Sequence, residues 1–226
     1  IRLNALSDAP LAEIGKTKPL RVVLEASVGM EDVRLFWAQM PSGMVRKSVK
    51  FDMDISYRAD RIGIRKFMAV MPGNFDLSGT GELASFRNLN NLAGVLNLEG
   101  NIQDVSFLNE KNKRFRIPDQ MRLSLAARAE AGVLHPRLEL CRGTGCVTVD
   151  GSYDIKNEGY DIRLASDRFD IGRFLPADSL GILTTDIKLT GHGYRFGKAN
   201  ARLTLDLREL VYKRHSYRDI LLATDV

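Results

Sequence analysis

Apolar and polar residues alternate strictly in several parts of this chain. In the stretch VKFDMDISY, residues 49–57, every odd position is apolar and every even position is charged or polar. This spacing is typical of a β-strand with one face in water, because successive side chains of a strand point to opposite faces. Similar alternation recurs in residues 20–28, 96–102, 121–127, 147–155, 160–164, 183–189 and 203–207. The pattern predicts an all-β fold.

Short polar segments separate these predicted strands. They lie at residues 59–60, 71–74, 109–112, 130–132, 156–159, 196–198 and 213–216, and they are rich in residues that favour turns. Parallel strands would need crossover connections of a dozen or more residues. We therefore expect a long antiparallel meander.

Helix is expected in only two places. The segment DIGRFL, residues 170–175, precedes Pro176 and predicts a single helical turn, with Asp170 as a candidate cap. Apolar residues with helical spacing also follow Asp32 and precede Pro41, although this segment fits a strand as well. The four helically spaced residues are Val33, Phe36, Trp37 and Met40.

The number of predicted strands constrains the overall shape. An open twisted sheet of more than about ten strands usually curls or splits into two packed sheets. We predict one elongated, repetitive β-domain over residues 1–226, in the form of a curved gutter or taco, with a closed sandwich as the alternative. Because the chain begins at Ile1 without a signal peptide or a membrane-spanning apolar run, we expect it to be a piece of a longer protein.

The stretch LSGTGELA, residues 77–84, matches the dinucleotide-binding pattern G-x-G-x-x-A. That pattern requires a helix to open at its third small residue, but residues 85–91 have no helical periodicity. Gly-x-Gly also recurs at residues 143–145 and 191–193, each time beside alternating residues. We interpret these glycines as sites of bulging, bending or close backbone approach on the apolar side of strands.

The two cysteines lie close together in the segment LELCRGTGCVTV, residues 138–149. A two-residue turn at Gly143 and Thr144 would place Cys141 opposite Cys146 in a hairpin. In a non-hydrogen-bonded pair the Cα atoms approach to about 4.5 Å, which allows a cross-strand disulfide. We predict this disulfide if the domain resides in an oxidising compartment, and two free thiols otherwise.

Other chemical motifs are weak. Asp52 and Asp54 form a D-x-D pattern, but they lie on the polar side of an alternating strand and are interpreted as a solvated face. His135, His192 and His215 have no catalytic partner at a suitable spacing. We expect no enzyme activity, no cofactor and no metal site. The net charge of +5 is mixed along the chain, so nucleic acid is not an expected partner.

The chain resembles the AsmA-like proteins, in particular the TamB translocation and assembly family of Bacteroidetes-type bacteria. The resemblance lies in FDLSGTG (residues 75–81), NLNNLAGVLNLEGNIQDVSF (88–107), FDIGRFL (169–175) and the segment 184–222. It implies a periplasmic part of an inner-membrane-anchored protein with a hydrophobic groove. The implied role is phospholipid transport to the outer membrane, or outer-membrane protein assembly with an Omp85-type partner that binds outside this segment.

A lipid groove would use one apolar face of the strands. The candidate residues are Phe51, Met53, Ile55, Leu96, Leu98, Leu123, Leu125, Leu203 and Leu205, and each buried methylene would contribute about 0.8 kcal/mol. The alternative is a structural or adhesion β-sandwich that binds protein and has no groove. A continuous open groove favours the lipid hypothesis, and a closed core favours the alternative.

Overall fold

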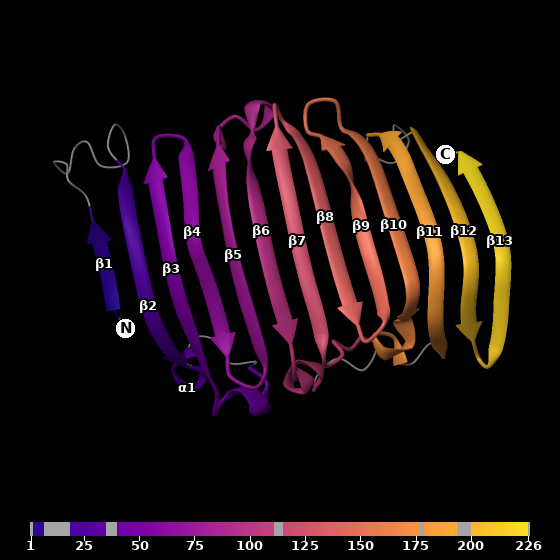
Figure 1. The fold of residues 1–226 in the computed structure, drawn as a ribbon, viewed down its shortest axis with the longest axis horizontal. Coiled ribbons are helices and arrows are strands. Elements are labelled where there is room, and N and C mark those ends of the chain that lie inside the picture. Colours follow the sequence, from indigo (N-terminus) through magenta and orange to yellow (C-terminus); the bar gives the residue numbers. More distant parts are fainter. Residues whose placement is uncertain are drawn as a thin grey trace.

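The protein is one curved, unclosed antiparallel sheet (Figure 1). The computed structural model describes residues 2–6, 19–34, 40–110, 115–176, 179–193 and 200–225. In these ranges thirteen strands pair in the order in which they occur in the chain. β1 and β13 are the two edges, so the predicted all-β meander is confirmed.

The strands are long and the helical segments are short. The strands are β1 (Arg2–Leu6), β2 (Leu20–Gly29), β3 (Ser48–Arg58), β4 (Arg61–Met71), β5 (Phe75–Ala84), β6 (Ala93–Ile102), β7 (Met121–Glu130), β8 (Val133–Arg142), β9 (Gly145–Asp154), β10 (Gly159–Asp170), β11 (Leu180–His192), β12 (Asn200–Tyr212) and β13 (His215–Asp225). The helical segments are α1 (Met30–Val33), η1 (Ser42–Met44), η2 (Leu89–Asn91), η3 (Ser106–Asn109) and η4 (Ile171–Arg173).

The two predicted helices have different outcomes. The single turn after Asp170 is confirmed as η4, but the side chain of Asp170 makes no capping hydrogen bond. Its carboxylate instead pairs with Arg173, at 3.2 Å from Nε. For the other prediction, the described part shows a short helix, α1, that ends at Val33, and Met40 lies outside any helix. Phe36 and Trp37 lie outside the described residues, as does the predicted turn at 196–198.

The two ends of the strands differ. We call the end at which β2, β4, β6 and β8 finish the helical end, because α1, η1, η3 and η4 lie there (Figure 1). A buried cluster packs at this end against the sheet's apolar side. Its members are Met30, Met40, Met44, Val49, Ala69, Met71, Val105 and Phe107. The opposite end, which we call the turn end, carries η2 and the short turns that join β3 to β4, β7 to β8 and β9 to β10.

The glycines of LSGTGELA lie inside β5 and have the expected structural role. Gly79 and Gly81 each pair with a leucine of β6, Leu98 and Leu96. A Cβ atom would lie 2.7 Å from the carbonyl oxygen of Asn97 at Gly79, and 2.8 Å from that of Val95 at Gly81. The structure therefore shows close backbone approach at these glycines. The adjacent register shift lies between Ile64 and Phe67 of β4, opposite the glycines.

Candidate apolar binding surface

One face of the sheet carries an uninterrupted row of uncharged residues that crosses twelve strands. The register pairs each member with the next one on the neighbouring strand, from β2 to β13. We call it the central row, and its members are Leu24, Met53, Phe67, Gly79, Leu98, Leu125, Leu138, Val149, Leu164, Ile187, Leu205 and Leu222. With about 4.8 Å between strands, the row is roughly 50 Å long.

The rows on either side of the central row are also uncharged. The row toward the turn end includes Ile55, Leu96 and Leu203. The row toward the helical end includes Phe51 and Leu123. Met53, Leu98, Leu125 and Leu205 belong to the central row itself. All nine groove candidates therefore lie on the same face, which we call the apolar face.

Two hydroxyl residues interrupt the apolar character of the row toward the helical end, and both are buried and bonded to backbone. Ser166 Oγ donates to the carbonyl oxygen of Leu183 at 3.1 Å and accepts from the N–H of Thr185 at 3.2 Å. Thr185 Oγ1 donates to the carbonyl oxygen of Asp206 at 3.0 Å. Since these groups are satisfied within the sheet, they add little polarity to the face.

The middle of the apolar face is not sealed. Central-row side chains from Phe67 to Leu205 are only half-buried, although their strands have neighbours on both sides. Leu96 and Ile162, in the adjacent row, each expose 38% of their surface. Because these side chains are neighbours in the register, they form a contiguous apolar surface, and such surfaces mark interaction sites when they are large.

A cavity of about 330 Å³ opens on this face toward the turn end. Its depth comes from small residues, including Gly81, Gly94 and Ala129, placed among larger apolar ones. Leu92, from the connection after η2, is buried beside it. The larger apolar lining residues are Ile62, Ile64, Leu83, Leu92, Leu96 and Leu134. Of these, sequence reasoning selected only Leu96, since the pocket depends on a loop and on the register of β4.

The opposite face is charged and carries cross-strand ion pairs. Arg21 on β2 binds both carboxylate oxygens of Asp54 on β3, with Nε–Oδ1 at 2.8 Å. This hydrogen bond lowers the pKa of Asp54 below its ordinary value. Asp52 pairs with Lys66 on β4. Both carboxylates of the D-x-D pattern are therefore engaged in ion pairs on the charged face.

The same arrangement recurs near the C-terminal edge. Arg163 on β10 binds Asp186 on β11, with Nε–Oδ1 at 3.0 Å, and this hydrogen bond lowers the pKa of the Asp186 carboxyl. Arg202 on β12 likewise lowers the pKa of Asp225 on β13. Ion pairs across adjacent strands keep this face hydrated and matched in charge, in contrast to the apolar face.

The cysteine hairpin has the predicted register. Gly143 and Thr144 form the turn between β8 and β9, and Cys141 pairs with Cys146. Their Cα atoms are 4.1 Å apart and their sulfur atoms form a disulfide. Cys141 is buried on the charged face beside Glu139. Among the described residues, these two sulfurs and Glu139 are the only group of three close potential metal ligands, and the disulfide occupies both sulfurs.

The histidines are far apart in the sheet. His135 lies on β8, His192 ends β11 and His215 begins β13, and all three are exposed. Within the described ranges, no side-chain hydrogen bond or ion pair joins any of these histidines to a serine, a cysteine or a carboxylate.

No protein-family model, curated protein or solved structure matches this chain. Within the described ranges, none of the helices has the length and apolar character needed to cross a bilayer.

Proposed function

We propose that the apolar face binds the acyl chains of phospholipids, and that the chain is a periplasmic segment of an AsmA/TamB-like envelope protein. In this role it would provide a hydrophobic groove for phospholipid movement between the inner and outer membranes, or would support outer-membrane protein assembly. An Omp85-type partner would bind outside this segment. No catalytic step is needed.

The observation that carries the proposal is the central row. It is uncharged across twelve strands, and its roughly 50 Å length, from the strand spacing, exceeds the roughly 30 Å hydrocarbon thickness of a bilayer. A small compact ligand would not require such length. A series of acyl chains lying across the strands would cover it.

The alternative of a structural or adhesion sandwich requires a second sheet over the apolar face. In the part of the chain that the structure describes, all thirteen strands belong to one sheet and the face is half-exposed. An open face of this kind favours the lipid proposal over the sealed module.

The test uses two double variants on β7. Leu123→Asn/Leu125→Asn introduces amides on the apolar face, and Ser124→Asn/Ala126→Asn introduces the same amides on the charged face. Phospholipid that copurifies after gentle extraction is quantified by mass spectrometry, and transfer is followed between vesicles of phosphatidylethanolamine and phosphatidylglycerol.

We expect the apolar-face variant to retain at least about tenfold less lipid, since each substitution replaces apolar carbons by an amide and a loss worth two methylenes, about 1.6 kcal/mol, already exceeds a factor of ten. The charged-face variant should behave as the unmodified protein. Lipid-free preparations of the unmodified protein, together with no transfer between vesicles, would refute the proposal.

A further inference from the structure

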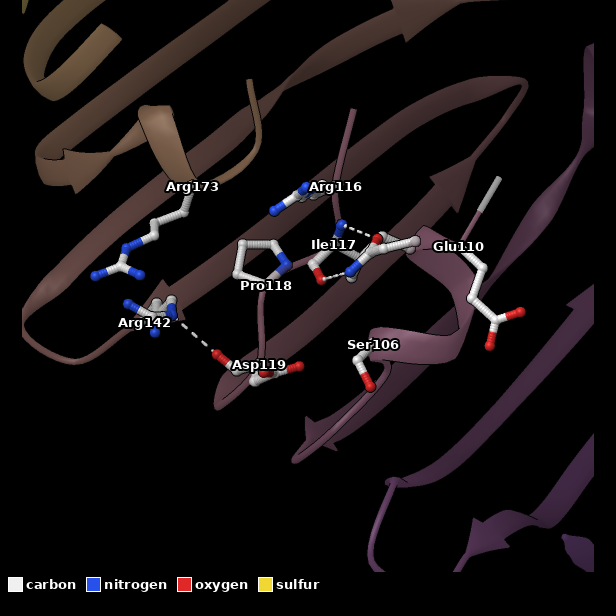
Figure 2. Close-up of a pocket in the computed structure, with 9 residues that line it drawn as sticks. Ser106, Glu110, Arg116, Ile117, Pro118, Asp119, Arg142 and Arg173 are labelled. Carbon is white, nitrogen blue, oxygen red and sulfur yellow. Dashed lines mark hydrogen bonds between the residues drawn. The ribbon is translucent and has the colours of Figure 1, made fainter. Parts of the chain in front are cut away.

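A second hollow, of about 420 Å³, lies at the helical end and differs in chemistry from the apolar cavity (Figure 2). Its walls come from η3, from the segment before β7, from the end of β8 and from η4. The lining residues are Ser106, Asn109, Glu110, Arg116, Ile117, Pro118, Asp119, Arg142 and Arg173. Three guanidinium groups thus reach one hollow from segments distant in the sequence.

Hydrogen bonds hold the walls of this hollow in place. The N–H of Arg116 donates to the carbonyl oxygen of Phe174 at 2.8 Å, which joins the segment before β7 to η4. The amide of Asn109 forms two bonds with the backbone of Ile117, at 2.8 and 2.9 Å. Arg142 Nε donates to the carbonyl oxygen of Asp119 at 2.9 Å. These hydrogen bonds therefore fix the backbone segments that carry the arginines before any ligand binds.

Most guanidinium donors in the hollow remain unused. A guanidinium has five N–H donors. In the described chain, Arg142 donates a hydrogen bond only from Nε, and Arg173 donates only from Nε, to Asp170. Among the described residues, the side chain of Arg116 makes neither a hydrogen bond nor an ion pair. The Nη groups are consequently available for an incoming acceptor.

The two carboxylates of the lining are directed elsewhere. Glu110 accepts from the N–H groups of Ser42 and Gly43, each at 3.1 Å, and Figure 2 shows its side chain pointing away from the arginines. The carboxylate of Asp119 accepts from the N–H of Val105 at 3.3 Å. In the described part of the chain, no ion pair joins Arg116, Arg142 or Arg173 to either of these carboxylates.

We propose that Arg116, Arg142 and Arg173 form a binding site for a phosphate group. Planar guanidinium forks bind the oxygens of phosphate in pairs, and three of them around one hollow match a tetrahedral anion better than a single carboxylate. The phosphate belongs either to a soluble phosphate compound or to a phospholipid headgroup. The proposal goes beyond acyl-chain binding and does not depend on it.

The test compares the unmodified protein with Arg116→Gln/Arg173→Gln in titrations with inorganic phosphate and glycerol phosphate, followed by the NMR signals of the arginine Nε–H groups. Arg142 is kept because it supports the frame. Arg137→Gln/Arg202→Gln is the matched control, since it removes the same charge from strands outside the hollow.

We expect at least about tenfold weaker phosphate binding for the hollow variant and no change for the control, because the variant removes two guanidinium groups that would donate charge-assisted hydrogen bonds to the phosphate. Arg116→Lys/Arg173→Lys should give an intermediate loss, since it keeps the charges without the fork. This second variant also preserves the test if the glutamine variant is unstable.

Vesicles distinguish the two sources of phosphate. If the protein binds phosphatidylglycerol vesicles through Arg116 and Arg173 but does not bind the soluble phosphates, the site is assigned to a lipid headgroup. If it binds the soluble phosphates, the site is assigned to soluble phosphate compounds. Equal binding by the unmodified protein, the hollow variant and the control in both assays overturns the site. Leu123→Asn/Leu125→Asn should leave phosphate binding intact, so failure of the groove and failure of this site are distinguishable.

Discussion

The apolar face is covered at the helical end and open in the middle, although the same strands form both regions. On β4, Met71 exposes 1% of its surface, whereas Phe67, which packs against the margin of the buried cluster, is only half-buried. On β7, Met121 is buried while Leu125 is half-buried. The difference comes from the helical segments, because residues such as Phe107 pack over only one end of the sheet.

This contrast separates stability from binding. The covered end removes apolar side chains from water and packs them against several neighbours, as a protein core does. The open middle leaves similar side chains half-hydrated, which sacrifices stabilisation that a covering element would supply. We therefore expect substitutions at the covered end to affect folding and substitutions in the middle to affect ligand binding.

The largest effect should come from Phe107→Ala at the covered end. Phe107 is 5% exposed within the buried cluster, and truncation of a buried phenylalanine costs about 3–5 kcal/mol. Urea unfolding followed by circular dichroism measures the loss. A loss below about 1 kcal/mol, the range of surface substitutions, would show that the cluster is not the stabilising core.

The next largest effect should come from the hairpin on the charged face at the same end. Cys141→Ser/Cys146→Ser removes a disulfide that closes a short loop, with a sequence separation of 5. Loop-closure entropy for such a loop gives about 2 kcal/mol of destabilisation. Urea unfolding measures it, and thiol labelling of the unreduced protein is the companion assay. Labelling of both cysteines would contradict the disulfide.

A smaller effect is expected for Leu125→Ala in the open middle. The side chain is half-buried, so the loss of its methylenes should reduce the free energy of unfolding by about 1 kcal/mol. The Leu125→Ala variant should show a clearer loss of copurified lipid than of free energy of unfolding. If Leu125→Ala destabilised the protein as much as Phe107→Ala, the middle of the face would be part of the core and the contrast would fail.

The alternation of apolar and polar residues predicted the meander and the shared apolar face. Side chains two positions apart in a strand lie on the same face, and the pairing register places the apolar side chains of neighbouring strands on that same face of the sheet. β4 was harder to recognise, since the shift between Ile64 and Phe67 moves its apolar positions from even to odd numbers. In β13 the consecutive residues Ile220, Leu221 and Leu222 hide the alternation.

The two hollows were beyond sequence reasoning for a different reason. Leu92 lines the apolar cavity from the connection between η2 and β6, and the path of this connection is set by the packing of the whole turn end. Arg116, Arg142 and Arg173 are separated by at least 26 residues from one another, and only the packing of η3 and η4 at the helical end brings them to one hollow. No local spacing marks such a group.

The smallest effect should come from the charged face, through Arg163→Gln. The hydrogen bond from Arg163 lowers the pKa of Asp186, so the pair stabilises the fold above the ordinary carboxyl pKa and this contribution is lost as the pH falls through the folded-state pKa. Without Arg163, the pKa of Asp186 should rise, as measured by NMR titration of its carboxyl carbon.

The stability difference between the unmodified protein and Arg163→Gln should be smaller than that for Leu125→Ala, because exposed ion pairs contribute little. It should be greatest near neutral pH and vanish in acid. Arg122→Gln, which removes a charge from β7 without breaking an ion pair among the described residues, is the control. An unchanged pKa of Asp186 would show that the ion pair with Arg163 contributes nothing to the stability of the charged face.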